Sequence, residues 1–347
     1  MSTTQSDRQV PATLRDVARV ARVHLSTVSR AMNVETRSLV NADTLARVLQ
    51  AVDELDYRPN QTARALRMKR SLSVGVIVPD LLNPMIVQMI GGIEGRLGEA
   101  GYLVLLGNSN HSDERAKLFL ETMSAHQVEG IISTAATEDD DALRDIARFG
   151  RPLVLANRSM TSGSFSSVVP DDQQCSELAI EHLVALGHQR IGHIAGPPTV
   201  SNGLLRRRGY EVALARRGMP VRSERVQAAV RYTVEEGERA CEKLFARCND
   251  LTAIYAGNDL LAIGCLDALA RRGLHCPEDI SIVGCNDMPF SGRFDPPLTT
   301  IHVPLAELGE IAADLLLELI VDHRREPRHV IVDPYLVVRG STAPALR

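Results

Sequence analysis

At 347 residues the chain is longer than a single hydrophobic core usually supports, so we expect more than one domain. With 44% hydrophobic and 24% charged residues, it has the balance of a soluble globular protein whose cores form without disulfides. Apolar runs such as 311–321 are interrupted by Asp or Glu, and residues 1–10 contain no apolar signal segment. The composition therefore predicts no membrane span and no export. The six cysteines form no CxxC pair and are expected to be reduced, which places the protein in the cytoplasm.

The net charge of −4 hides an uneven distribution along the chain. Residues 1–70 contain 12 Arg and Lys against 7 Asp and Glu, whereas the remainder contains 27 against 36. A basic N-terminal module on an acidic body is typical of a phosphate-binding head attached to a sensor domain.

Residues 13–33, TLRDVARVARVHLSTVSRAMN, predict two short helices joined by a tight turn. Thr13 can cap the first helix, with Asp16 completing a capping box, and the second helix begins near Leu25. The helix pair would pack through apolar positions at Val17, Ala18, Val20, Ala21 and Val28. Small, hydroxylated and basic side chains on the exposed face of the second helix suit a DNA groove. The alternative is a generic helical hairpin.

A third helix is expected over 42–55, and Pro59 ends it because proline disfavours helix in the preceding residue. Asn60 can then cap a short fourth helix over 61–66. From Ser73 onward, buried strands alternate with amphipathic helices, the pattern of a doubly wound parallel sheet. About 270 residues of this pattern favour two similar α/β subdomains over one sheet.

The segment D-V-A, a short turn and S-T-V-S-R-x-x-N resembles the helix-turn-helix of the LacI/GalR family of transcriptional regulators. The string YRPNxxARAL resembles the hinge helix of that family, and GVIVPDLLNP, GHQRIGHIAGPP, AGNDLLAIG and CPEDISIVGCND resemble its core, which is similar to periplasmic sugar-binding proteins. The resemblance implies a helix-turn-helix domain over 12–58, a hinge helix and linker over 59–72, and an effector-binding core over 73–341. Its two subdomains would comprise about 73–170 with 303–332, and about 171–302 with 333–347.

The resemblance also implies which residues contact DNA. The head would contribute Thr13, His24, Leu25, Ser26, Thr27, Ser29, Arg30 and Asn33, and the hinge Asn60, Ala63, Leu66 and Arg67. Leu66 would be the wedge that enters the minor groove and kinks the duplex. The alternative for the hinge is an inter-domain linker whose leucine packs on the body. Arg22 and His24 depart from the family pattern, which has Gly in the turn and Ser at the second cap.

Ligands of open α/β sheets lie at the carboxyl ends of the strands. Polar loops at such ends, together with family positions, give the candidate effector-binding residues Asn83, Met85, Asn157, Arg158, Asn202, Arg206, Asn258 and Asn286. Taken one at a time, each could equally be a helix cap or loop hydrogen bond. Asn157 and Asn286 stand where many sugar-sensing members have Asp, so the cleft should be less negative. We expect a ligand with an acidic group to be tolerated there and to pair with Arg206.

No GxSxG, HExxH or GxxxxGK[ST] motif occurs, and the glycine-rich run 91–95 falls inside a predicted helix. His188 and His193 do not have a metal-ligand spacing, so no metal, cofactor or enzymatic activity is expected. The sequence predicts a regulator, more specifically a repressor, that binds a palindromic operator as a homodimer and responds to a sugar, a sugar acid or a related metabolite. The alternatives are a sugar-binding transport protein and an enzyme on a Rossmann-like sheet.

Overall fold

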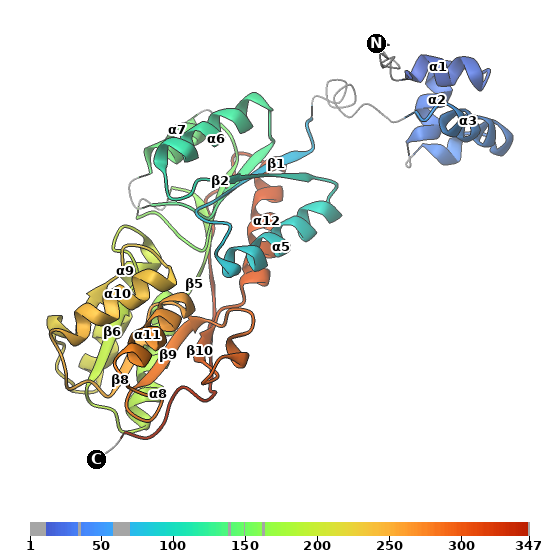
Figure 1. Ribbon diagram of the computed structural model, residues 1–347. Coiled ribbons are helices and arrows are strands. Elements are labelled where there is room, and N and C mark those ends of the chain that lie inside the picture. Colours follow the sequence, from blue (N-terminus) through green and yellow to red (C-terminus); the bar gives the residue numbers. More distant parts are fainter. Residues whose placement is uncertain are drawn as a thin grey trace, which may run out of the picture. The chain divides into compact units, whose positions relative to one another are not determined.

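The computed structural model describes residues 12–33, 36–57, 70–137, 140–148, 150–161 and 164–345. Its contacts divide the chain into two units, Met1–Ser71 and Leu72–Arg347. The first unit is called the head and the second the core, and each is described by itself (Figure 1).

The head is a small bundle around a buried cluster of valines and alanines. Its elements are α1 (Leu14–Val20), α2 (Leu25–Met32), a 3-10 turn (Arg37–Leu39) and α3 (Ala42–Glu54). Val17, Val28 and Val48 are fully buried at its centre. Val20, predicted to pack between the helices, is instead 40% exposed, because it lies on the outer face of the last turn of α1. The predicted hinge helix over 61–66 lies outside the described residues.

The first sheet of the core is parallel, with the strand order β11-β5-β4-β3-β1-β2. Its strands are β1 (Ser73–Val78), β2 (Leu103–Asn108), β3 (Gly130–Ser133), β4 (Leu153–Ala156), β5 (Ser166–Pro170) and β11 (His329–Val332). Helices α5 (Pro84–Glu99) and α12 (Leu305–Val321) pack together on it, while α6 (Asp113–Ala125) and α7 (Asp141–Arg148) form a second pair (Figure 1).

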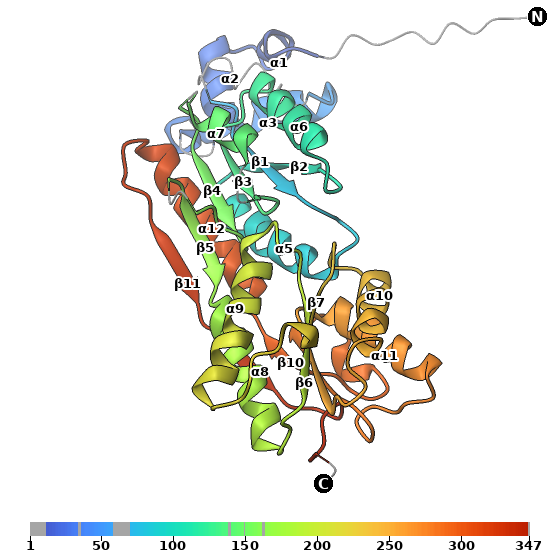
Figure 2. The same cartoon turned by 90° about the vertical axis from the view of Figure 1, so that its left-hand side faces the viewer.

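The second sheet has the order β12-β10-β9-β8-β6-β7 and is parallel except that β12 runs antiparallel to β10. Its strands are β6 (Ile191–Ala195), β7 (Val226–Ala228), β8 (Ala253–Ala256), β9 (Ser281–Asn286), β10 (Thr299–His302) and β12 (Tyr335–Val337). One face is covered by α8 (Asp172–Ala185) and α9 (Ser201–Arg216), and the other by α10 (Val234–Phe245) and α11 (Asp259–Arg271) (Figure 2). The predicted pair of doubly wound sheets is confirmed, with the antiparallel edge strand as its one departure.

The chain passes between the two sheets three times. It leaves the first sheet after β5 and after β11, and it returns from the second sheet after β10. Helix α12 therefore belongs to the first sheet although β10 precedes it, and it packs on β3, β4 and β5. These three connections bring strand ends of both sheets to a common boundary.

Two adjacent glycines of α5 differ in their surroundings, since Gly92 packs closely against α12 and Gly91 faces open space. A Cβ on Gly92 would lie 2.0 Å from the carbonyl oxygen of Ala306 in α12, whereas a Cβ on Gly91 meets nothing within 4 Å. Gly92→Ala should therefore lower the free energy of unfolding by about 1–3 kcal/mol, because the helices must separate. Gly91→Ala, the matched control, should be neutral or stabilising by up to about 1 kcal/mol. Urea unfolding followed by circular dichroism measures both; equal stabilities would contradict the packing argument.

His193 lies inside the second sheet and serves packing rather than metal binding. Its ring stacks between Tyr210 and Tyr255, with ring centroids 4.9 and 4.8 Å away, and its Nδ1 pairs with the Tyr255 carbonyl oxygen at 2.9 Å. Burial lowers the pKa of His193 to about 4.

Because this folded-state pKa lies below the ordinary value of 6.5, the unfolded chain binds the proton more readily. Stability is then complete above about pH 6.5 and falls as the pH drops toward 4. Between pH 7 and pH 5, the wild type should lose about 2 kcal/mol more unfolding free energy than His193→Phe. Urea unfolding of both proteins at the two pH values tests this, and an identical loss in both would refute it.

Candidate functional site

The N-terminal ends of α1 and α2 are both capped by side chains. Thr13 Oγ1 accepts from the backbone N–H of Asp16, and Asp16 Oδ2 accepts from the backbone N–H of Thr13 at 3.0 Å, which confirms the predicted capping box. His24 caps α2, since its Nδ1 accepts from the Ser26 N–H at 3.3 Å. Arg22 occupies the left-handed region with a φ of 53°, the strained position that the sequence indicates for the turn. The departures from Gly and Ser are thus accommodated without loss of either helix.

Helix α2 is amphipathic, with one buried and one exposed face. Val28 and Ala31 are buried in the head, while Leu25, Ser26 and Arg30 are exposed. Of the other candidate DNA contacts, Thr13, His24 and Asn33 are exposed and Thr27 and Ser29 are half-buried, whereas Asn60, Ala63, Leu66 and Arg67 lie outside the described residues. The free face of α2 therefore presents one apolar, one hydroxyl and one guanidinium group to a partner.

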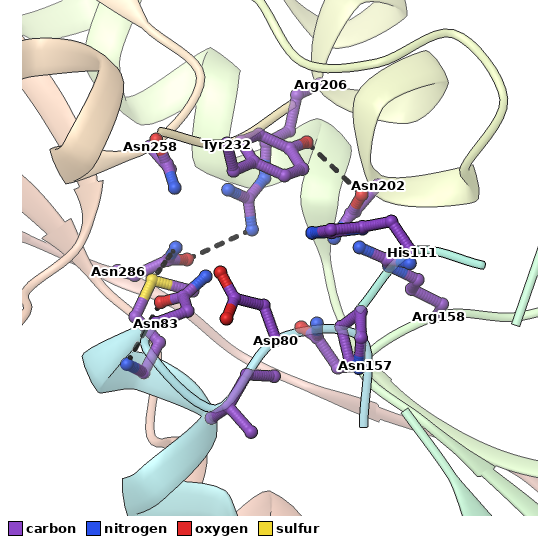
Figure 3. A pocket seen from close by; sticks show the side chains of 13 residues that line it. Asp80, Asn83, His111, Asn157, Arg158, Asn202, Arg206, Tyr232, Asn258 and Asn286 are labelled. Carbon is purple, nitrogen blue, oxygen red and sulfur yellow. Dashed lines mark hydrogen bonds between the residues drawn. The ribbon is translucent and has the colours of Figure 1, made fainter. Parts of the chain in front are cut away.

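All eight candidate effector-binding residues line one pocket at the boundary between the two sheets (Figure 3). This inner pocket has a volume of about 20 Å³, and its lining also includes Pro79, Asp80, Ile86, His111 and Tyr232, which the sequence did not single out. The candidate residues come from both sheets: Asn83, Met85, Asn157 and Arg158 from the first, and Asn202, Arg206, Asn258 and Asn286 from the second.

The asparagines shape the loops at the strand ends as well as lining the pocket. Asn83 caps α5 by accepting from the Met85 N–H at 3.2 Å, and Asn258 caps α11 by accepting from the Leu261 N–H at 2.9 Å. Asn157 and Asn286 have positive φ values of 66° and 107°, a region that Asn tolerates better than most residues. Asn83 and Asn258 can therefore cap a helix and bind a ligand at the same time, because capping uses Oδ1 and leaves the amide NH₂ for the ligand. The buried Nδ2 of Asn258 has no hydrogen-bond partner among the described residues.

Arg206, expected from the sequence to pair with an acidic ligand, already has a carboxylate partner within the protein. Its Nε donates to Asp172 Oδ1 at 2.8 Å, and both side chains are only 2% exposed. Its Nη1 donates to the Gly257 carbonyl oxygen at 2.6 Å and its Nη2 to Asn286 Oδ1 at 3.1 Å. Burial raises the pKa of the Asp172 carboxyl, and the Arg206 guanidinium acts in the opposite direction. The pair therefore offers an incoming ligand hydrogen bonds without a net charge.

Asp172 is one residue of the candidate site that the sequence does not single out, although a local signal exists. Asp171 and Asp172 are adjacent, and Asp171 Oδ1 already caps α8 by accepting from the Gln174 N–H at 2.9 Å. Because Asp171 alone caps the helix, the carboxylate of Asp172 is free for another role. Its partner lies 34 residues away on α9, a distance that no local pattern indicates.

Tyr232 is the second missed residue, and it forms a wall of the pocket. Its hydroxyl donates to Asn202 Oδ1 at 3.2 Å. A Cβ on Gly196 would lie 2.0 Å from the Tyr232 hydroxyl oxygen, so only glycine leaves room for this ring. Burial raises the pKa of Tyr232 to about 12, which keeps the phenol protonated as a donor.

No group of three or more His, Cys, Asp or Glu side chains within the described ranges could hold a metal ion. The pocket instead combines amide groups, one phenol, two guanidinium groups and the carboxylate of Asp80. Such an arrangement can recognise hydroxyl and other polar groups of a small molecule through hydrogen bonds.

The Asp172–Arg206 pair predicts a large stability difference between adjacent substitutions. Asp172→Asn leaves Arg206 as an uncompensated buried cation and should lower the free energy of unfolding by about 3 kcal/mol. Asp171→Asn keeps a good N-cap and should change it by less than about 0.5 kcal/mol. Thermal and urea unfolding of the two variants decide this, and a mild effect at Asp172 would show that the ion pair is not formed in solution.

Comparison with known proteins adds independent findings. A family model described as bacterial regulatory proteins, lacI family, matches residues 13–60, and a periplasmic binding protein-like domain matches residues 180–342. The HTH-type transcriptional repressor CytR of Escherichia coli (strain K12) is 33% identical over 335 residues, covering 96% of this chain and 97% of that protein. The repressor PurR of Pasteurella multocida (strain Pm70) is 33% identical over 336 residues, covering 96% and 100%.

Among solved structures, the lac repressor dimer bound to operator and the anti-inducer ONPF matches with a TM-score of 0.85 and 30% identity, covering 96% of this chain and 100% of that chain. Within the described ranges, no helix is both long and apolar enough to span a membrane. The relatives are repressors and not enzymes. With a helix-turn-helix head, two doubly wound sheets and sequence similarity along 96% of its length, this chain belongs to the lacI family of bacterial regulatory proteins and is a transcriptional regulator.

Proposed function

We propose that this protein is a repressor that binds a palindromic operator as a homodimer and is controlled by a small, carbohydrate-like effector. The observation that carries the proposal is the free face of α2, where Leu25, Ser26 and Arg30 are exposed opposite the buried Val28 and Ala31. A short helix with a polar and basic outer face fits the major groove of B-DNA.

The roles on α2 follow from the chemistry of the side chains. Leu25 can contact a thymine methyl group and Ser26 can hydrogen-bond a base edge, so both would read sequence. Arg30 carries a permanent charge and would bind a phosphate, as would the capped ends near Thr13 and His24. The excess of positive charge in residues 1–70 favours DNA binding by the head, because basic side chains that bind phosphates release counterions from the DNA.

The division of the chain is part of the proposal. The head over 12–58 would bind DNA, the segment 59–72 would be the hinge with Leu66 as its wedge, and the core over 73–341 would bind the effector. The core would have one subdomain over about 73–170 and 303–332, and another over about 171–302 and 333–347. Coupling between the two functions would pass through the hinge.

The lining of the inner pocket supports an effector rich in hydroxyl groups. Asn83, Asn157, Asn202, Asn258 and Asn286 offer amide donors and acceptors without charge. Among solved relatives, a CelR structure contains cellobiose and a lacI-family regulator from Enterococcus faecium contains ribose. Those ligands belong to those proteins; for this chain they support the carbohydrate-like class and no particular sugar.

Exposed apolar side chains support self-association. Strand β2 lies at the edge of the first sheet, and its Leu103, Leu105 and Leu106 are 64%, 38% and 41% exposed. Val87 on α5 and Leu118 on α6 are also exposed. We propose that this part of the first sheet is the dimer interface, because isolated leucines along one edge strand otherwise favour aggregation.

Selection from randomised operator libraries tests the proposed reading of DNA. Leu25→Ala and Ser26→Ala should change the preferred base at individual positions, at about 1–3 kcal/mol per position. Arg30→Ala should weaken all sequences to a similar extent and reduce the salt dependence by about one counterion per protomer. Arg222→Ala, which removes an exposed charge from the core, is the matched control and should leave operator affinity unchanged.

The proposal fails if the wild-type chain selects no palindrome, or if Leu25→Ala and Ser26→Ala both retain the wild-type preference at every position. Equal losses of affinity for Arg30→Ala and Arg222→Ala would remove Arg30 from the interface.

A further inference from the structure

We infer that the effector carries one anionic group, and that this group binds Arg158 in a chamber adjoining the inner pocket. The inference rests on the proposed function, because it specifies the chemical class of the effector. It also replaces the expectation that an acidic ligand would pair with Arg206.

The inference rests on a buried cation that has neither an ion-pair partner nor, at its Nε, a hydrogen-bond partner among the described residues. Arg158 follows β4 and is only 6% exposed, yet its Nε has no hydrogen-bond partner among the described residues. Within the same residues, no carboxylate forms an ion pair with it, since Asp172 is engaged with Arg206. Burial lowers the pKa of the Arg158 guanidinium, but arginine remains a cation at physiological pH. Burying an unpaired charge is costly, and a fold retains one where a ligand compensates for it.

Arg158 differs from the other buried charges of this region in having no partner among the described residues. Arg206 is paired with the buried Asp172, and the buried Asp259 accepts from Thr300 Oγ1 and from the Met288 N–H. Asp80 also lines the inner pocket, but it is half-buried and forms no ion pair with Arg158 among the described residues. His111 itself is held neutral, since burial lowers its pKa and the charges of Arg158 and Arg231 act in the same direction. Arg158 is therefore the buried cation of this region that no carboxylate pairs with among the described residues.

Arg158 lies where two cavities meet. The outer chamber has a volume of about 600 Å³ and shares Pro79, His111, Arg158 and Tyr232 with the inner pocket of about 20 Å³. Figure 3 shows Arg158 and His111 on the side of the inner pocket opposite Asn83 and Asn286. A ligand whose hydroxyl groups reach the asparagines would therefore extend its other end past Tyr232 toward Arg158.

The far wall of the outer chamber limits where an anion can sit. Asp113 and Asp140 also line it, and each charge raises the cost of an anion nearby. Arg231, exposed and next to Tyr232, lines the chamber as well and adds a second positive charge. The anionic group is thus confined to the Arg158 side, which fits one carboxylate or one phosphate on a polar molecule. Sugar acids and sugar phosphates share this chemistry.

Inorganic phosphate titrated at constant ionic strength tests the subsite with the full-length protein. Wild type should show a saturable rise in melting temperature by scanning calorimetry, since a ligand of the native state stabilises it by mass action. Arg158→Met should lose this rise, while Arg222→Met, the matched control at an exposed arginine of the core, should keep it. Without phosphate, Arg158→Met should melt at the same temperature as wild type or higher, which shows that the variant folds.

Matched ligand pairs, titrated by calorimetry, form the second arm: glucose against gluconate and glucose 6-phosphate, and ribose against ribose 5-phosphate. The anionic member should bind at least tenfold more tightly to wild type, and Arg158→Met should abolish the difference.

Absence of saturable phosphate stabilisation, or an equal rise in the melting temperature of wild type and Arg158→Met, would overturn the inference. A neutral effector that binds both proteins equally and alters operator affinity would overturn it as well, yet would leave the proposed function intact. Failure of the wild type to bind any operator would instead count against the proposed function.

Discussion

The buried ion pair between Arg206 and Asp172 is the interaction on which the inner pocket depends. It joins α9 to α8, and the same guanidinium also binds the loop after β8 through Gly257 and the end of β9 through Asn286. One rigid fork of donors thereby fixes four elements of the second sheet relative to each other. Because the pair is neutral as a whole, it creates a polar floor that does not select strongly for ligand charge. Charge selection is left to Arg158, which comes from the other sheet.

The location of the pocket explains how a small molecule could change the arrangement of the core. Its walls come from two sheets that three chain connections join, and two hydrogen bonds between described residues link the walls. Asn286 donates to the Met85 sulfur, and the Ser159 N–H donates to Ser201 Oγ at 3.0 Å. The inner pocket leaves only about 20 Å³, room for roughly one water molecule, so an effector that reaches the asparagines would have to move the two walls relative to each other. A ligand shifts such an equilibrium only by its difference in affinity for the two arrangements, and contacts to both walls supply that difference.

The asparagines could be predicted from sequence because their position follows from topology. Asn83, Asn157 and Asn258 each follow a buried strand and Asn286 ends one, and parallel strands bring their carboxyl ends to one edge. Asp172 and Tyr232 could not be predicted in this way, since their roles depend on contacts with α9 that lie 34 and 30 residues away. The pairing of Arg206 with Asp172 could not be predicted for the same reason, because the amino-acid sequence shows a charge but not its partner. Arg158 was found as a polar loop residue, whereas its lack of a partner is visible only in three dimensions.

Thermodynamic linkage between effector and operator tests the account most directly. Operator affinity of the full-length chain is measured by fluorescence anisotropy with and without a metabolite that raises its melting temperature, and metabolite affinity is measured by calorimetry with and without operator. The account predicts that each ligand changes the affinity of the other by the same factor, at least about fivefold in either direction. An effector that occupies the pocket and leaves operator affinity unchanged would contradict it.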